Sequence, residues 1–284
     1  MIVRVYGSRG IIPVSGEKFK KYGGNTACLA IRDKKSNEFF IFDAGTGLKK
    51  LGEDLIAIEH IDKIHIFLTH IHSDHISGLP FFLPLYSKKY TIIIYGPASL
   101  KYNLKSEILS LFKQHTNPVH LGEPVADIQI MELEETTLTI SNINIKTILL
   151  NHTIENLGYK ISVDETSICY LTDHEPYRKG MENIKQIKNS RYKDFILNTS
   201  MMIADAQYLP DEYEMYKGWG HAPVNYIINQ AIEGRVKRVV LTHHDPNRTD
   251  IQIDDILQHY RKLLIKKNIK LEIIAAKEID EYTV

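Results

Sequence analysis

Cysteine and tryptophan are scarce in this chain of 284 residues, which has two cysteines and one tryptophan. Cys28 and Cys169 lie far apart, each within an apolar run, and no CxxC pair occurs. The sequence therefore lacks a disulfide framework and suits a reducing compartment. We interpret both thiols as small buried hydrophobic groups.

An excess of charge is also absent, because 35 basic residues balance 35 acidic residues. Proteins that grip long nucleic acids usually carry a basic excess or stripe. The short cluster Lys18, Lys20 and Lys21 is more typical of a solvated loop. No apolar run reaches the roughly 18 residues needed to span a bilayer, and the N-terminus does not resemble a signal peptide. We therefore expect a cytoplasmic protein that does not associate with membranes.

Short apolar and β-branched runs, separated by turn residues, fill much of the sequence. They occupy most of the first 70 residues and recur from about residue 128 to 171, where they resemble an antiparallel meander. Helical and strand patterns alternate after residue 180. No linker or repeat interrupts the chain. The pattern predicts one α+β domain over residues 1–284, in which two sheets pack face to face with helices outside, a four-layer αββα sandwich.

Histidine is abundant, with 13 residues. The densest group has the spacing HxHxDH and follows directly on a predicted strand over residues 64–68; its members are His70, His72, Asp74 and His75. Imidazole nitrogens and carboxylate oxygens are ligands that zinc accepts. Core packing does not explain four such groups within six residues. We interpret this loop as a metal-binding loop.

Three further predicted strands run into residues of the same kind. His152 follows residues 148–150, Asp173 follows residues 169–171, and His243 and His244 follow residues 239–241. Each ending alone is weak evidence, since a histidine at a strand end is more often a satisfied polar residue. Four such endings become a coherent site if they converge on one edge of the sandwich. His174 beside Asp173 is expected either behind the site or facing solvent.

The order of these residues, HxHxDH and then His, Asp and His, resembles the signature of the metallo-β-lactamase-fold superfamily. The resemblance extends over nearly the whole chain. Other segments resemble the phosphodiesterase branch of this superfamily, around ribonuclease Z, phosphorylcholine esterase and class III cyclic-nucleotide phosphodiesterases. These segments are GSRG at 7–10, YGGNT at 22–26, FDAGTG at 42–47, DAQY at 205–208 and GWGH at 218–221.

The resemblance implies two divalent metal ions that activate a water. Zinc is the first expectation, and manganese or iron are alternatives because the same ligands bind them. The implied ligands are His70, His72 and His152 for one ion, Asp74, His75 and His243 for the other, and Asp173 as a bridge. Asp74 is also the candidate acceptor of the water's proton. Contributions of His244 and His174 stay open.

Outside the ligands, His221 is the most informative residue. In the phosphodiesterase branch the matching histidine contacts the phosphate and can act as general acid, which an alkoxide leaving group needs. The family often has Ser or Thr next, whereas this chain has Ala222. Asp43 is expected either to support a metal-bound histidine or to form a turn. Trp219 is expected either to stack on a base or, with slight preference, to pack the loop.

The leading prediction is a metal-dependent hydrolase that acts as a phosphodiesterase on a small substrate such as a cyclic nucleotide. One alternative is tRNA 3′-end processing, as in ribonuclease Z, whose family uses a long basic arm that this chain has little room for. Another is thioester, lactone or β-lactam hydrolysis, which the DAQY and GWGH segments disfavour. His72 disfavours flavin-dependent diiron reductases, which carry glutamate there. The balanced charge disfavours a nucleic acid partner but leaves it open, and homodimer formation also stays open.

Overall fold

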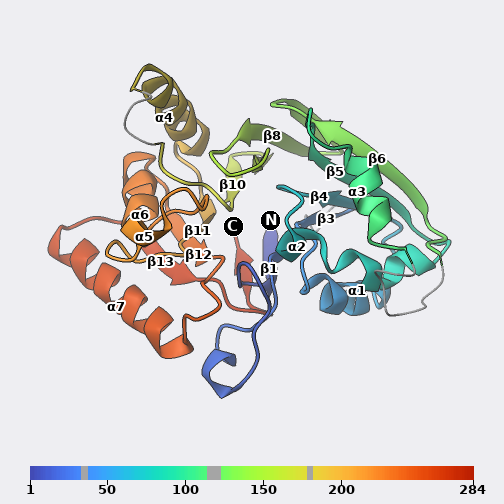
Figure 1. Ribbon diagram of the computed structural model, residues 1–284, viewed down its shortest axis with the longest axis horizontal. Coiled ribbons are helices and arrows are strands. Elements are labelled where there is room, and N and C mark those ends of the chain that lie inside the picture. Colours follow the sequence, from blue (N-terminus) through green and yellow to red (C-terminus); the bar gives the residue numbers. More distant parts are fainter. Residues whose placement is uncertain (33–37, 114–122, 178–181) are drawn as a thin grey trace. The chain divides into compact units, whose positions relative to one another are not determined.

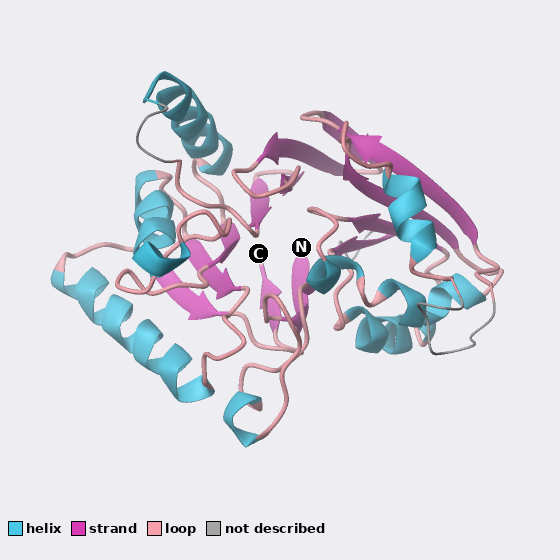
Figure 2. Cartoon of the chain, viewed as in Figure 1, coloured by secondary structure: helices cyan, strands magenta, loops and turns pink. Residues whose placement is uncertain are grey.

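The computed structural model describes residues 1–32, 38–113, 123–177 and 182–284. These residues form two compact units, each with a seven-stranded mixed sheet and helices beside it (Figures 1 and 2). Unit 1 consists of Met1–Val14, Gly23–Glu134 and Lys277–Thr283, and unit 2 of Ser15–Tyr22, Glu135–Ala276 and Val284. A single domain over residues 1–284 stays a prediction.

The sheet of unit 1 has the strand order β14-β1-β2-β3-β4-β5-β6. Its strands are β1 (Ile2–Gly7), β2 (Cys28–Arg32), β3 (Glu38–Phe42), β4 (Lys63–Phe67), β5 (Thr91–Pro97), β6 (Asp127–Leu133) and β14 (Glu281–Thr283). Strands β3 to β6 pair in parallel, so β3 and β4 end at the same edge. That edge carries Asp43 and the HxHxDH loop, just beyond the two strand ends.

Helices cover one face of this sheet. They are α1 (Leu48–Ile56), α2 (Ser73–Ile76) and α3 (Leu104–Ser110), with 3-10 turns η2 (Leu79–Phe81) and η3 (Leu83–Tyr86). Helix α1 buries Leu48, Leu51 and Leu55 in a core cluster with Ile64 and Ile66 of β4. This i, i+3, i+7 spacing is that of an amphipathic helix, and burying such a stripe drives the packing.

An aromatic ladder crosses β3, β4 and β5 in unit 1. His65 stacks on Phe40 with ring centroids 5.1 Å apart and on Tyr95 at 5.9 Å. Phe67 stacks on Tyr95 at 4.4 Å. His65 is buried, and burial lowers its pKa to about 4. The ring is therefore neutral at physiological pH and belongs to the core.

The sheet of unit 2 has the order β13-β12-β11-β10-β9-β8-β7. Its strands are β7 (Thr137–Ile140), β8 (Ile143–Leu149), β9 (Leu157–Val163), β10 (Thr166–Leu171), β11 (Met201–Asp205), β12 (Arg238–Thr242) and β13 (Glu272–Ala275). Strands β7 to β10 are antiparallel, and β10 to β13 are parallel. The ends of β10, β11 and β12 therefore share one edge, where Asp173, Asp205 and His243 lie.

Helices α6 and α7 pack on the parallel part of this sheet (Figure 1). The helices of unit 2 are α4 (Glu182–Ile196), α5 (Tyr213–Tyr216), α6 (Val224–Glu233) and α7 (Asp250–Lys266), with a 3-10 turn η1 (Glu17–Phe19). Helix α7 begins with a capping box in which Thr249 and Gln252 satisfy each other's backbone amides. Ile227 of α6 and Leu257 of α7 join one core cluster with strand residues such as Val239.

Two predictions about individual elements were wrong. The first 70 residues contain helix α1, not only strands and turns. Strand β6 pairs in parallel with β5 of unit 1, so the antiparallel meander begins at β7. Sequence alternation identifies a strand but carries no information about which strand pairs with it. Among the described helices, none is long and apolar enough to cross a membrane.

Candidate metal centre

In unit 1 the HxHxDH loop brings its four polar side chains together. The loop leaves β4, and helix α2 begins at Ser73, with His72 at the N-cap position. His70 Nε2 lies 2.9 Å from His72 Nδ1, and His75 Nε2 lies 3.4 Å from Asp74 Oδ2. His70, Asp74 and His75 are buried. One short loop thus gathers three imidazoles and a carboxylate, as the sequence predicts.

Asp43 supports this loop from the end of β3. Its Oδ2 lies 2.8 Å from His75 Nδ1, and its Oδ1 accepts hydrogen bonds from the Thr69 amide and hydroxyl at 2.8 and 2.9 Å. A metal-binding imidazole normally donates its other nitrogen to a carboxylate or carbonyl. Asp43 therefore leaves His75 Nε2 available as a ligand. Asp43 also has a positive φ of 58°, so both predicted roles, support and turn, coincide in one residue.

In unit 2, His152 and His243 both direct Nε2 towards Asp173. The Nε2 of His152 lies 3.9 Å from Asp173 Oδ1, and the Nε2 of His243 lies 3.5 Å from Asp173 Oδ2. Each Nδ1 has its own acceptor at 3.0 Å, the Gly220 carbonyl for His152 and Gln207 Oε1 for His243. This pattern fits a divalent cation, because it fixes the tautomer that leaves Nε2 as the ligand atom.

Asp173 and His243 share an unusual backbone conformation, with φ values of 61° and 55°. Non-glycine residues in this left-handed region cost energy and cluster at functional sites, although Asp and His tolerate it better than most residues. The conformation turns each side chain sharply at the end of its strand. In addition, Asn156 Nδ2 donates to the carbonyl of Asp173 at 2.7 Å.

His221 pairs with Asp205, the last residue of β11. The Nδ1 of His221 lies 3.1 Å from Asp205 Oδ2, and 3.4 Å from Asp173 Oδ1. Burial raises the pKa of Asp205, and the hydrogen bond from His221 lowers it. Ligand atoms of Asp173, His221 and His243 lie within 4.8 Å of one another, so distance alone also permits His221 as a ligand. Its bond to Asp205 leaves Nε2 for a proton transfer.

The neighbouring histidines His174 and His244 have different surroundings. His174 is fully buried, accepts from the Asn151 amide at 3.2 Å, and stacks on Tyr192 at 4.5 Å. Burial lowers its pKa to about 3, so it is neutral and does not face solvent. His244 is buried with its ring edge-on to Tyr22. Among the described residues, neither belongs to a group with ligand spacing.

Several residues that hold these side chains lie outside any ligand pattern in the sequence. Gln207 lies within DAQY, a segment noted only for its resemblance, yet it supports His243. Glu175 went unnoticed, although it lies two positions after Asp173. Trp219 meets Tyr216 of the same loop edge-on, in line with the preferred expectation that it packs the loop, although the residue is 58% exposed.

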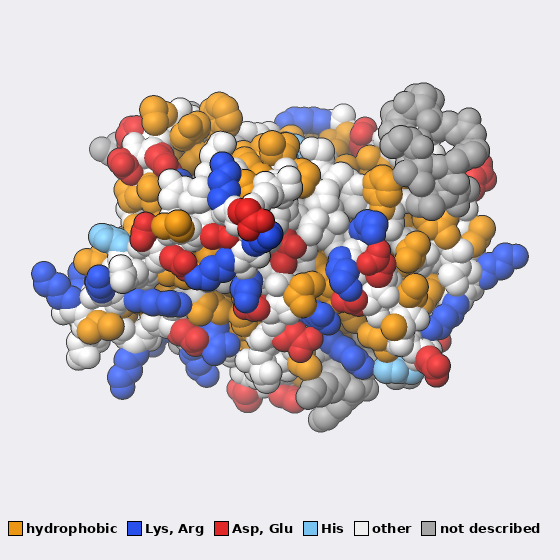
Figure 3. Space-filling view, turned by 90° about the horizontal axis from the view of Figure 1, so that it is seen from below, with side chains coloured by type: hydrophobic (Ala, Val, Ile, Leu, Met, Phe, Trp, Pro, Cys, Tyr) orange, Lys and Arg blue, Asp and Glu red, His pale blue; other side chains and the backbone are white. Residues whose placement is uncertain are grey.

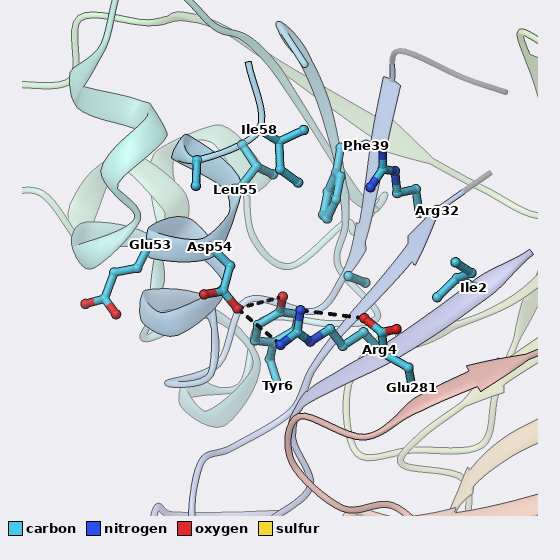
Figure 4. A pocket seen from close by; sticks show the side chains of 12 residues that line it. Ile2, Arg4, Tyr6, Arg32, Phe39, Glu53, Asp54, Leu55, Ile58 and Glu281 are labelled. Carbon is cyan, nitrogen blue, oxygen red and sulfur yellow. Dashed lines mark hydrogen bonds and ion pairs between the residues drawn. The ribbon is translucent and has the colours of Figure 1, made fainter. Parts of the chain in front are cut away.

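Unit 1 also contains a cavity of about 370 Å³ beside α1, lined by residues of β1, β2, β3 and β14 (Figure 4). None of the candidate ligands lines it. Arg4 lies 3.6 Å from both Asp54 and Glu281, and the Tyr6 hydroxyl donates to Asp54. The cavity therefore belongs to the packing of α1 rather than to the metal-type residues.

Comparison with known proteins agrees with this geometry. A family model described as a β-lactamase superfamily domain matches residues 39–244. A ribonuclease Z of Staphylococcus epidermidis is 26% identical over 287 residues, which cover 91% of this chain and 86% of that protein. The family match includes every candidate ligand.

Solved structures show the same fold. The metallo-β-lactamase fold protein YhfI from Bacillus subtilis superposes with a TM-score of 0.69 at 17% identity, covering 99% of this chain and 98% of the other. The short form of human tRNase Z has a TM-score of 0.64 at 20% identity, covering 100% and 99%. The predicted α+β metallo-β-lactamase fold is confirmed. The chain belongs to the β-lactamase superfamily domain family and is a metal-dependent hydrolase of the metallo-β-lactamase fold.

Proposed function

We propose that this hydrolase is a phosphodiesterase that cleaves a small phosphodiester such as a cyclic nucleotide. The observation that carries the proposal is the buried pair of Asp205 and His221. A carboxylate on Nδ1 orients the imidazole and stabilises its protonated form, so Nε2 can deliver a proton. An alkoxide leaving group needs that proton, whereas a thiolate leaves readily without it. The pair thus favours phosphodiesters over thioesters.

The proposal includes two divalent ions, with zinc as the first choice. The ligand assignment is that of the resemblance: His70, His72 and His152 for one ion, Asp74, His75 and His243 for the other, and Asp173 for both. When bound, such ions polarise a phosphoryl oxygen and lower the pKa of a water. Three observations support the assignment: Nδ1 is engaged on His75, His152 and His243, which reserves Nε2 for a ligand role.

The side chains of the protein have separate tasks in this reaction. Asp74 is proposed to accept the proton of the attacking water. Its Oδ2 also accepts a hydrogen bond from the Ile11 amide at 2.7 Å, which fixes the carboxylate. His221 contacts the phosphate and protonates the departing oxygen. Asp205 compensates the charge of protonated His221, because its Oδ2 lies 3.1 Å from His221 Nδ1.

The second candidate is tRNA 3′-end processing, and two observations favour it. The relative from Staphylococcus epidermidis is named ribonuclease Z. Helix α4 also has four basic residues against two acidic ones in the sequence ENIKQIKNSRYKDFI. However, Arg191 pairs with Glu135, and Lys193 lies 3.4 Å from Glu233. On the face in Figure 3, basic and acidic side chains are interspersed over most of the surface. We therefore favour the small substrate.

The test is a turnover comparison on metal-loaded protein. The substrates are bis-p-nitrophenyl phosphate, cyclic nucleotides, a tRNA precursor and a lactone, each at low and moderate salt. We expect small phosphodiesters to be cleaved fastest, with little effect of salt. RNA held by several phosphate contacts would instead show a steep loss with salt. Faster trimming of the tRNA precursor than of any cyclic nucleotide would replace the first candidate by the second.

A further inference from the structure

The carboxylate of Glu175 binds three donors from one segment of unit 2. Glu175 Oε1 accepts from the Tyr213 hydroxyl at 3.0 Å and from the Gly218 amide at 2.6 Å, while Oε2 accepts from the Gly220 amide at 3.2 Å. The residue is 4% exposed. Hydrogen bonds to a buried charged acceptor are about twice as strong as neutral ones. A single side chain thus holds both ends of the segment Tyr213–Gly220, here called the GWG loop.

The backbone of Glu175 is fixed beside the candidate ligand His152. Its amide donates to the Asn151 carbonyl at 2.8 Å, and Asn151 Nδ2 donates back to the Glu175 carbonyl at 2.9 Å. His174, the preceding residue, accepts from the Asn151 amide. The strand end that carries His152 is therefore joined to the residue that holds the GWG loop.

The GWG loop approaches His152 too closely for any side chain to intervene. A Cβ on Gly220 would lie 2.1 Å from His152 Nδ1, and the φ of Gly220 is 92°. The Gly220 carbonyl accepts from that same Nδ1 at 3.0 Å. Both glycines of the loop have positive φ and offer no packing surface, and Trp219 between them is largely exposed. Tyr216 of the loop stacks on the buried Tyr208 with ring centroids 4.6 Å apart, whereas the segment from Gly218 to Gly220 is held by its hydrogen bonds to Glu175.

We infer that Glu175 is a positioning residue for the site. It holds the GWG loop so that Gly220 orients the imidazole of His152 and the following residue, His221, meets the substrate. Its carboxylate binds three donors of the loop, so we assign it no role as a ligand. The effect on turnover rests on the proposed function, whereas the effect on the loop and on His152 does not.

The test uses Glu175→Gln, and Trp219 is its reporter. The amide has the size of the carboxylate, but only its oxygen accepts, so it cannot serve the Gly218 and Gly220 amides together. Trp219 is the only tryptophan of the chain, so its fluorescence anisotropy decay reports the motion of the GWG loop alone. We expect faster local motion of Trp219 and roughly 10–100-fold weaker metal binding, the usual range for a lost supporting contact.

The matched control is Glu135→Gln in the same unit. Like Glu175, Glu135 accepts a hydrogen bond from a backbone amide, that of Leu149 at 2.9 Å. It pairs with Arg191 and makes none of the hydrogen bonds to the GWG loop that Glu175 makes. This variant should leave Trp219 motion, metal binding and turnover unchanged. Tyr213→Phe removes one of the three donors. Its Trp219 motion and its metal affinity should lie between those of the wild type and those of Glu175→Gln. It also serves as the test if Glu175→Gln does not fold.

Activity gives a second readout. Turnover of Glu175→Gln should fall more for a phosphodiester with an alkyl leaving group than for a p-nitrophenyl ester, because His221 is displaced as well. Unchanged Trp219 anisotropy and metal affinity in folded Glu175→Gln would overturn the inference. If wild-type protein cleaves no phosphodiester while Trp219 and metal affinity still respond as expected, the proposed function fails and the positioning role stands.

Discussion

The two sets of candidate ligands are built in different ways. In unit 1, four of them come from one six-residue loop, and Asp43 supports that loop through both His75 and Thr69. In unit 2, His152, Asp173 and His243 follow three different strands. Each of these three is held by a separate partner: the Gly220 carbonyl for His152, Asn156 for the Asp173 backbone, and Gln207 for His243.

Ligand-type side chains can thus be gathered by one short loop, as in unit 1, or by the ends of several strands, as in unit 2. A contiguous loop orders its ligands together, so two supports hold it, Asp43 and the Ile11 amide that donates to Asp74. Distributed ligands need one support each, and each support comes from elsewhere in the sequence. Mutation of a residue that supports a metal ligand typically lowers metal affinity or activity by roughly 10–100-fold. We therefore expect unit 2 to contain more residues whose loss impairs the centre without touching substrate.

The largest effect is expected for Asp173→Asn. The change removes the charge proposed to bridge both ions, while Asn tolerates the positive φ of 61° at this position. Turnover should fall to background, and bound metal should fall from two equivalents towards one, as measured by elemental analysis. Asp164→Asn is the control, since Asp164 has φ 50° but lies exposed in the turn between β9 and β10. Full metal content in Asp173→Asn would contradict the bridging role.

A large but smaller effect is expected for His221→Ala. The protein should keep both metals and lose roughly 10²–10⁴ in turnover, the usual contribution of a general acid. The loss should shrink for p-nitrophenyl esters, whose leaving group scarcely needs a proton. Equal losses on good and poor leaving groups would indicate positioning instead of acid catalysis. Loss of metal would mean that His221 is a ligand, which its distances to Asp173 and His243 permit.

An intermediate effect is expected for Gln207→Leu, which tests the distributed supports directly. The substitution removes the acceptor of His243 Nδ1 and leaves the ligand atom in place. Metal affinity should weaken by roughly 10–100-fold, measured by competition with a chromogenic chelator. Gln129→Leu on the exposed side of β6 is the matched control. If both variants bind metal like the wild type, His243 does not depend on its support.

The smallest effect on turnover is expected for His65→Phe, a histidine with no part in the reaction. Its pKa is lowered from 6.5 to about 4, mainly by burial, so the folded state stays neutral where the unfolded chain takes up a proton. The free energy of unfolding should therefore fall as pH drops from 6.5 to 4, by about 3 kcal/mol at most. Phe fits the ladder with Phe40 and should remove this loss. Denaturant unfolding at pH 7 and pH 4.5 measures this loss of unfolding free energy. An identical pH dependence in wild type and variant would show that His65 does not cause the loss.

The fold class, which is confirmed, and the candidate ligands could both be predicted from the sequence because both leave local patterns. HxHxDH occupies six consecutive positions, and His152, Asp173 and His243 each follow an apolar strand. Supports such as Glu175 and Gln207 leave no such pattern, since their partners lie 45 and 36 positions away. The parallel pairing of β6 with β5 was not predicted for the same reason. Both the supports and this pairing depend on tertiary contacts that no short window of sequence contains.

The count of metal ions per chain tests the central claim most directly. Protein purified without chelator and reconstituted with excess zinc should contain two equivalents by elemental analysis after removal of free metal. The reason is that the proposed assignment gives each ion three ligands of its own and lets the ions share Asp173. A value that stays at one equivalent after reconstitution would contradict the dinuclear centre and, with it, the assignment of Asp173 as a bridge.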